Sequence, residues 1–390
     1  MTPERPVLIA GGGIGGLATA IALAQRGIAS RVLERRPQFS EEGAGIQLGP
    51  NAVHALRHLG VADTLAPRVG VPTAIVLRDG MAGHALQRLP LGEWIAARHA
   101  APYWLAHRRD LQRALLDTIG ELALVRVSMS FDVASYESNR DGVTLIAHDG
   151  ARVAGSTLIG ADGVFSRVRQ QLWNARSPRF SGMTAARTVV SAKAVAGLLD
   201  TSAVGVWIAP GAHVVHYPVR GGREIAVIVI APAAASDHGW ARPVDSSRVL
   251  ASVRGFSDTL LRALEVAADW RCWALYELDP LPRWSAQNVT LLGDAAHPTL
   301  PFLAQGGALA LEDAVVLASS LSSGGDVAPA LAAYEIARRQ RTRAIVAAAR
   351  RNGRIFHLLG LAARARNIGL GLLPPERVMA RLDWVYGWRP

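Results

Sequence analysis

The chain has 390 residues, of which 50% are apolar, and is long enough to bury a large core and form two domains. Its single cysteine, Cys272, excludes an internal disulfide framework and fits a reducing compartment, so we expect a cytoplasmic protein. We expect no signal peptide, because no charged and then apolar segment precedes Val7. Arg364 and Arg366 interrupt the most apolar late stretch, which argues against a transmembrane segment.

The formal net charge of +11 is concentrated near the end of the chain, where residues 331–390 hold twelve arginines against three acidic residues. The cluster RRQRTR, residues 338–343, lies in a helical pattern, for which a solvated face is the default interpretation. No aromatic residue is interleaved there for stacking on bases. We therefore expect no nucleic-acid partner.

The opening stretch VLIAGGGIGGLATAIALAQRGIASRVLE predicts a strand at residues 7–10, a glycine turn, a helix closed by Gly27 and a second strand at residues 31–33. Gly11, Gly13 and Gly16 match the G-x-G-x-x-G pattern that holds a dinucleotide pyrophosphate at a helix N-terminus. Glu34 follows at the distance expected for an acid that binds ribose hydroxyls. Strand, glycines, helix and acid in this order predict a Rossmann-type unit, without distinguishing NAD from FAD.

The middle of the chain predicts a change of architecture. We expect a helix from Pro50 or Asn51, an amphipathic helix in HRRDLQRALLDTI, and hairpin turns at Asp141-Gly142 and Asp149-Gly150. Residues 180–273 read as mainly β, with strands in HVVHYPV and REIAVIVI. Residues after Gly306 read as largely helical. The predicted fold is α/β: a Rossmann-type domain (residues 1–70, 101–179 and 281–330), an inserted, mainly β substrate domain (71–100 and 180–280), and a helical C-terminal region (331–390).

Two later motifs concern the cofactor. LLGDAAHPTLPFLAQGGALALEDA places Asp294 after a strand, where a carboxylate can accept hydrogen bonds from a polyhydroxyl chain such as ribitol. Gly306 and Gly307 then open a helix whose N-terminus can face an anion, which suits a reduced flavin. IGADGVFSRVRQQL supplies Asp162 between a strand and a helix, where helix capping is an equally good explanation.

Together, these three motifs resemble the FAD-dependent aromatic hydroxylases typified by p-hydroxybenzoate hydroxylase. GAGIQLGPNA, HRRDL, SGMTAAR and LDWVYGW are most similar to the salicylate and 3-hydroxybenzoate hydroxylase branch. The resemblance covers nearly the whole chain. It implies bound FAD, NAD(P)H as co-substrate, aromatic compound catabolism, and a monomer or homodimer without a metal site. The residues that it assigns to the cofactor are Gly11, Gly13, Ile14, Gly15, Gly16, Glu34, Arg35, Gly45, Arg108, Gln112, Asp162, Asp294, Pro301, Gly306 and Gly307.

The implied reaction is reduction of FAD by NAD(P)H, formation of a C4a-hydroperoxyflavin with O2, and attack by an electron-rich ring. The chain has no second G-x-G-x-x-G, which fits a transient visit by the nicotinamide. Such chemistry needs a dry pocket between the domains and help in deprotonating a phenol.

His213 and Tyr217 are the candidates for that help, because the period of two in HVVHYPV puts them on one strand face and His216 on the other. The resemblance supports both as catalytic residues. His297 reads as structural. Arg187 is a candidate for a substrate carboxylate, or equally for an ion pair at the surface or domain interface.

We therefore expect an FAD monooxygenase acting on a small phenolic or hydroxy-heteroaromatic acid of the salicylate, 3-hydroxybenzoate or 6-hydroxynicotinate type. The alternatives are a hydroxylase of the same fold acting on a purine-like or phenazine ring, and a non-flavin NAD-dependent dehydrogenase.

Overall fold

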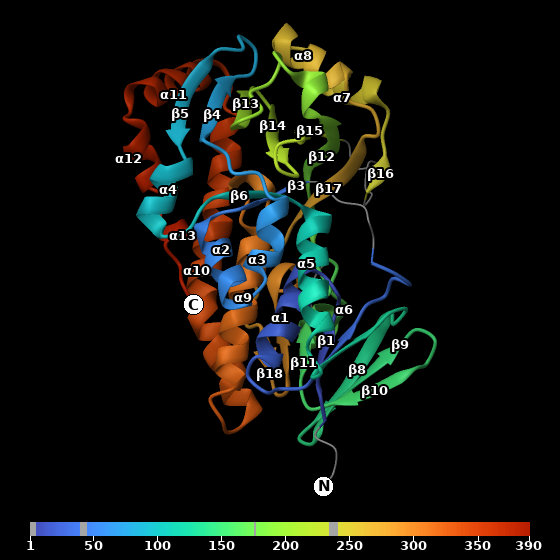
Figure 1. Ribbon diagram of the computed structural model, residues 1–390. Helices are drawn as coiled ribbons and strands as arrows, with labels where there is room; N and C mark the ends of the chain where they lie inside the picture. Colours follow the sequence, from blue (N-terminus) through green and yellow to red (C-terminus); the bar gives the residue numbers. More distant parts are fainter. Residues whose placement is uncertain (1–4, 40–44, 175–176, 234–240) are drawn as a thin grey trace.

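A parallel sheet forms the base of the molecule in the computed structural model, which describes residues 5–39, 45–174, 177–233 and 241–390 (Figure 1). Its neighbouring strands come from three distant parts of the sequence, and only the β18–β19 pair is antiparallel. The strand order is β18 (Ser285–Ala286), β19 (Val289–Leu291), β11 (Leu158–Gly160), β1 (Val7–Ala10), β2 (Ser30–Leu33) and β7 (Val125–Ser128).

Helices pack on this sheet and on one another. Helix α1 is buried over nearly its whole length, because it lies between the sheet and two further helices, α5 and α9. That position explains why its sequence is apolar on every side. The helices of this part are α1 (Ile14–Ala24), α2 (Pro50–His58), α3 (Ala62–Leu65), α5 (Arg108–Gly120), α6 (Arg167–Trp173), α9 (Gly306–Leu321) and α10 (Val327–Phe356).

Two small sheets complete the base. The turns at Asp141-Gly142 and Asp149-Gly150 join the strands of a three-stranded sheet, as the sequence predicts. The second small sheet is a pair of strands that crosses between the base and the upper half of the molecule. These strands are β8 (Val133–Asn139), β9 (Gly142–Ala147), β10 (Arg152–Gly155), β3 (Gly45–Leu48) and β6 (Trp104–His107).

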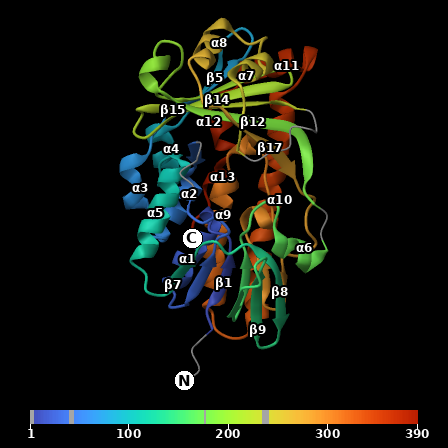
Figure 2. The same ribbon diagram turned by 90° about the vertical axis from the view of Figure 1, so that its right-hand side faces the viewer.

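A mostly antiparallel sheet of eight strands forms the upper half (Figure 2). One face packs toward the base, and the other packs on α7 (Ser246–Ser252) and α8 (Asp258–Glu265), two helices within a region that the sequence predicts to be mainly β. The strand order is β16 (Arg242–Pro243), β17 (Arg271–Glu277), β12 (Arg179–Ser191), β15 (Glu224–Pro232), β14 (Ala212–Val219), β13 (Val204–Ala209), β4 (Ala74–Asp79) and β5 (Ala85–Pro90).

The predicted fold class is confirmed in this arrangement. The eight-stranded sheet takes strands from both segments predicted for the substrate domain. Helix α10 begins at Val327, before the predicted start of the C-terminal region, and extends from beside α9 up to the second sheet. The remaining helices are α4 (Gly92–His99), α11 (Gly360–Leu372), α12 (Pro375–Ala380) and α13 (Asp383–Tyr386). Within the described ranges, every helix falls short of the length and hydropathy that a bilayer crossing requires.

Candidate active site

The glycine turn after β1 has the geometry that its pattern predicts. Gly11 adopts a φ of +105°, and a Cβ atom on Gly16 would lie 2.0 Å from the Gly11 carbonyl oxygen. These two positions therefore close the turn and pack α1 tightly against β1. Gly13 has nothing within 4 Å of its Cβ position and lines a cavity, so its backbone is open to a ligand.

This difference between glycines gives the first prediction. Gly13→Ala is expected to fold normally and to weaken FAD binding at least about tenfold, because the methyl group occupies the space of the pyrophosphate. Gly16→Ala is expected to fail to fold, because its methyl group meets backbone. The measurement is a fluorescence titration of the apoprotein with FAD. Gly120→Ala, at an open helix end, is the control, and equal FAD affinity of the Gly13 and Gly120 variants would contradict the prediction.

Glu34 and Gln112 hold the glycine turn from opposite sides. The buried Glu34 carboxylate accepts a hydrogen bond from the Gly12 amide at 2.8 Å, directly after β2. The Gln112 amide, on α5, donates to the Gly12 carbonyl at 3.4 Å. Arg35 is exposed beside them. The roles predicted for these residues toward the ribose and phosphates of FAD stay predictions. Glu34 and Gln112 both contact Gly12, within the glycine turn.

Asp162 caps helix α6, which is one of the two explanations that the sequence offered. One of its carboxylate oxygens accepts hydrogen bonds from the amides of Arg167 and Val168 at 2.7 and 3.2 Å. The other oxygen is buried, without a hydrogen-bond partner among the described residues. The fully buried Arg169 side chain of α6 donates to the Ala295 carbonyl at 2.9 Å. The motif thus also ties α6 to the loop that carries Asp294.

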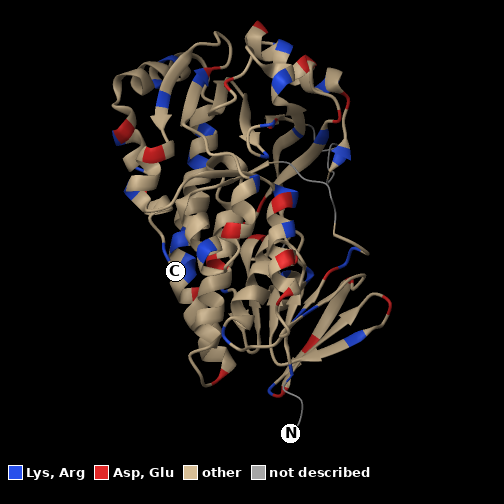
Figure 3. Cartoon of the chain, in the orientation of Figure 1, with Lys and Arg blue, Asp and Glu red and all other residues tan. Residues whose placement is uncertain are grey.

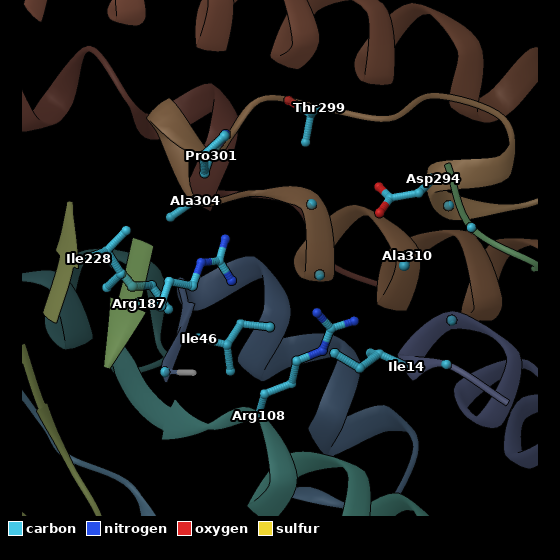
Figure 4. A pocket seen from close by; sticks show the side chains of 18 of the residues that line it. Ile14, Ile46, Arg108, Arg187, Ile228, Asp294, Thr299, Pro301, Ala304 and Ala310 are labelled. Carbon is cyan, nitrogen blue, oxygen red and sulfur yellow. The ribbon is translucent and has the colours of Figure 1, made fainter. Parts of the chain in front are cut away.

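Asp294 and Arg108 face each other across the cavity, from the loop after β19 and from the start of α5 (Figure 4). Both side chains are accessible within the cavity. The surrounding protein raises the pKa of the Asp294 carboxyl by removing water, and the charges of His297, Arg108 and Arg169 oppose that rise. An anionic acceptor and a guanidinium in one enclosed space suit the ribityl and phosphate parts of FAD.

The loop from Thr299 to Gln305 and the first residues of α9 form another wall of the cavity. Pro301 and Ala304 face the interior, and α9 begins at Gly306 (Figure 4). A Cβ atom on Gly307 would lie 2.7 Å from the end of the Ile46 side chain, so this glycine lets β3 approach the helix N-terminus. The cavity therefore presents a small-residue helix end to whatever fills it, as a flavin ring requires.

Buried charges under α9 support this wall. Asp313 accepts hydrogen bonds from His297 and from Arg338, both at 2.7 Å. Arg338 also pairs with Glu312, which in turn accepts hydrogen bonds from Arg341. The sequence-based expectation of a solvated face for residues 338–343 is wrong for Arg338 and Arg341, because they neutralise carboxylates inside the fold. His297 is structural, as predicted.

Tyr217 lines the cavity from the second sheet, and His213 does not. A Cβ atom on Gly45 would lie 2.4 Å from the Tyr217 ring, so that glycine lets β3 pack against the tyrosine. His213 lies on the same face of β14, as predicted, but behind the lining, and its Nδ1 lies 2.7 Å from Nε2 of His357. His216 is buried on the opposite face beside Trp207.

The buried histidines give a second prediction. Burial lowers the pKa of His213 to about 3, helped by His357, and lowers the pKa values of His216 and His357 to about 4. The unfolded chain takes up protons at these residues below about pH 6.5, whereas the folded chain does not. The contribution of these histidines to the free energy of unfolding is therefore expected to be complete above pH 6.5 and to fall as the pH decreases toward 4. Thermal midpoints measured from pH 7.5 to 5 should fall less in His213→Gln, and identical pH slopes in the two proteins would contradict the assignment.

Sequence reasoning missed several residues of the site. Gln47 lines the cavity and accepts a hydrogen bond from the Tyr103 hydroxyl at 2.7 Å, and His357 reaches His213 from the far end of α10. A polar residue inside the otherwise apolar strand of GAGIQLG was the available signal for Gln47. No local pattern distinguishes His357, because only the packing of α10 brings it to β14.

Comparison with known proteins agrees with this geometry. A family model described as an FAD binding domain matches residues 4–349. A 3-hydroxybenzoate 6-hydroxylase of Polaromonas naphthalenivorans (strain CJ2) is 37% identical over 99% of this chain and 96% of its own. A 6-hydroxynicotinate 3-monooxygenase of Bordetella bronchiseptica is 34% identical over 87% of this chain and 89% of its own. The structure of Klebsiella pneumoniae HpxO complexed with FAD and uric acid is similar with a TM-score of 0.88, at 27% identity over 99% and 97% of the two chains.

The fold and site thus define an FAD-binding oxidoreductase built from a dinucleotide-binding sheet and a second sheet over the cavity. The chain belongs to the group A flavoprotein monooxygenases and is an aromatic hydroxylase. Its cofactor is FAD, and NAD(P)H is the reductant typical of this class. The predicted family, enzyme class and cofactor are confirmed, and the alternative of a non-flavin dehydrogenase is wrong.

Proposed function

We propose that the protein hydroxylates a small phenolic or hydroxy-heteroaromatic acid. The observation that carries the proposal is the environment of Arg187 on β12. Its guanidinium lies at the cavity and 5.2 Å from the centre of the Trp273 ring, and its Nε has no hydrogen-bond partner among the described residues. Within those residues it forms no ion pair with a carboxylate. An enclosed positive charge without a carboxylate partner is costly, and the carboxylate of an aromatic acid would compensate it.

The rest of the cavity wall supports the same class of substrate. Val215, Ile228 and Ile230 offer an apolar surface for a ring, and Figure 4 shows Ile228 and Arg187 on the side of the cavity opposite Asp294. Bound FAD, once reduced, would activate O2, one atom of which is transferred to the ring while the other leaves as water. The task of the protein is to hold the ring beside it and to exclude water. In this proposal Tyr217, which lines the cavity, hydrogen-bonds the phenol oxygen.

His213 has a separate place in the proposal, as proton acceptor. Because His213 lies behind the cavity lining, it would act on the proton through groups that line the cavity, and an anionic guest would raise its pKa because negative charge favours the protonated imidazole. His213→Ala is expected to lower the rate of hydroxylation and to divert NAD(P)H oxidation into peroxide, with FAD still bound. The measurement is the ratio of hydroxylated product to NAD(P)H consumed, with flavin absorbance as control. Unchanged coupling and turnover would remove His213 from the catalytic residues.

The experiment that tests the proposed function is a substrate screen. The relatives named above carry the names of enzymes acting on 3-hydroxybenzoate and 6-hydroxynicotinate. We expect a hydroxybenzoate or hydroxypyridine carboxylate to stimulate NAD(P)H consumption and to yield a hydroxylated product, identified by mass spectrometry. Uric acid, present in the HpxO structure, is the comparison compound for a purine-like substrate. Turnover of uric acid without turnover of any aromatic carboxylate would contradict the proposal.

A further inference from the structure

A second, strongly basic cavity lies next to the flavin site. Its volume is about 810 Å³, and it is bounded by the start of α5, by β12, by the β14–β15 turn and by the start of β17. Figure 3 shows basic residues near the upper end of α5 and along these strands. Five arginines line it, against the two carboxylates of Glu224 and Asp269: Arg109, Arg187, Arg220, Arg223 and Arg271.

Only a thin wall separates the two cavities. Arg187 lines both of them. At the start of α5, the consecutive residues Arg108 and Arg109 line the flavin cavity and the basic cavity respectively. Trp273, which contacts the Arg187 guanidinium, lies on the basic side. A ligand anchored by charge in the basic cavity would therefore lie next to the flavin cavity, with Arg187 between the two.

The charge of the basic cavity is only partly neutralised. Arg220 forms an ion pair with Glu224 at 3.1 Å and approaches Asp110 at 3.7 Å. Arg223 is exposed, and its Nε donates to the Arg220 carbonyl at 3.2 Å. The remaining positive charge faces an open space large enough for a nucleotide. Guanidinium groups are the preferred protein partners of phosphate oxygens because they can donate paired hydrogen bonds.

We propose that the basic cavity binds the diphosphate of the pyridine nucleotide that reduces FAD. The proposal rests on the use of NAD(P)H and extends the proposed function by giving the reductant its own site. The single glycine turn of the chain is taken by the FAD diphosphate, so the second dinucleotide needs another source of positive charge. The arginines supply that charge, and Trp273 offers a ring for stacking at the end nearest the flavin.

The test measures nucleotide binding to the oxidised, FAD-loaded protein, so that no turnover is needed. Calorimetric titrations use NAD⁺, NADP⁺ and ADP-ribose, with inorganic pyrophosphate as a probe of charge alone. In Arg223→Glu, the Kd for ADP-ribose and for the better of the two nucleotides is expected to rise at least about tenfold, with a smaller rise in Arg223→Gln. Arg126→Glu, an equal charge change at an exposed position on β7, is the control and should leave each Kd unchanged.

Three results would overturn the proposal: unchanged nucleotide affinity in Arg223→Glu, an equal loss in Arg126→Glu, or a loss confined to the aromatic substrate. Binding of pyrophosphate with no additional affinity for ADP-ribose would also overturn it, because it would show a general anion site. The proposed function can fail independently. If no aromatic carboxylate is hydroxylated but Arg223→Glu weakens nucleotide binding, the basic cavity keeps its assignment and only the substrate class is wrong.

Discussion

Arg187→Gln is expected to lower kcat/KM for the aromatic acid by about 30- to 150-fold. The substitution removes a charge-assisted hydrogen bond to the substrate carboxylate, which contributes about 2–3 kcal/mol. The effect is expected to be large because the guanidinium lies at the cavity without a competing carboxylate among the described residues. The measurement is steady-state product formation with the best substrate of the screen.

The control for Arg187 is a neutral substrate. The carboxamide analogue of the same acid should be turned over about equally well by the original protein and by Arg187→Gln, because neither can form the ion pair with it. Flavin absorbance shows whether FAD is retained. Since Arg187 also lines the basic cavity, the Kd for ADP-ribose is measured in parallel. An equal loss of activity on acid and carboxamide would contradict the role of Arg187 as the carboxylate partner.

Arg338→Met is expected to lower the free energy of unfolding by about 3–5 kcal/mol, because it removes the buried cation that pairs with both Asp313 and Glu312. The two carboxylates are left with only their other partners, such as His297 and Arg341. Arg338 is 1% exposed, and it contacts Asp313 and Glu312 at 2.7 Å each. The thermal midpoint of the FAD-loaded protein should fall by at least about 5 °C. The control is Arg339→Met, at the next residue of α10, which breaks a partly exposed ion pair with Glu335. It should lower the free energy of unfolding by less than about 1 kcal/mol. Similar midpoints for the two variants would contradict the prediction.

The same network sets a second pH window. His297 and Arg338 outweigh burial and lower the pKa of Asp313 to about 2. Because the folded-state pKa lies below the unfolded value of 3.8, the stabilisation from Asp313 is complete above about pH 4 and is lost as the pH falls toward 2. The buried histidines therefore contribute to the loss of stability between pH 6.5 and 4, and Asp313 contributes to the loss below pH 4.

Local sequence patterns predicted the strands, the turn and the helix of the dinucleotide-binding sheet. The glycine turn, the acid after β2 and Asp294 after β19 each follow from a short stretch in which strand, turn and helix signals agree. The alternation in HVVHYPV likewise put His213 and Tyr217 on one face. These inferences depend only on neighbours in sequence, where backbone geometry is regular.

Other features depended on contacts between distant segments. Alternation gives the face of a strand, but it does not show which residue on that face reaches a cavity, so Tyr217 lines the site and His213 lies behind it against His357. Arg338 and Arg341 read as part of a solvated face because their carboxylate partners are on α9, outside the local window.

The sequence by itself determined the dinucleotide-binding turn, because strand, glycines and helix follow one another in contiguous residues, and the resemblance of three separate motifs to a known family pointed to FAD. Tertiary structure alone decided that Arg187 enters the cavity, that the C-terminal arginines neutralise buried charge, and that five arginines from separate segments surround a second cavity. The reason is physical: the burial and pairing of a charge depend on which segments meet in the fold, and a local pattern of residues does not show those meetings, even for Arg338 and Asp313, which are 25 positions apart.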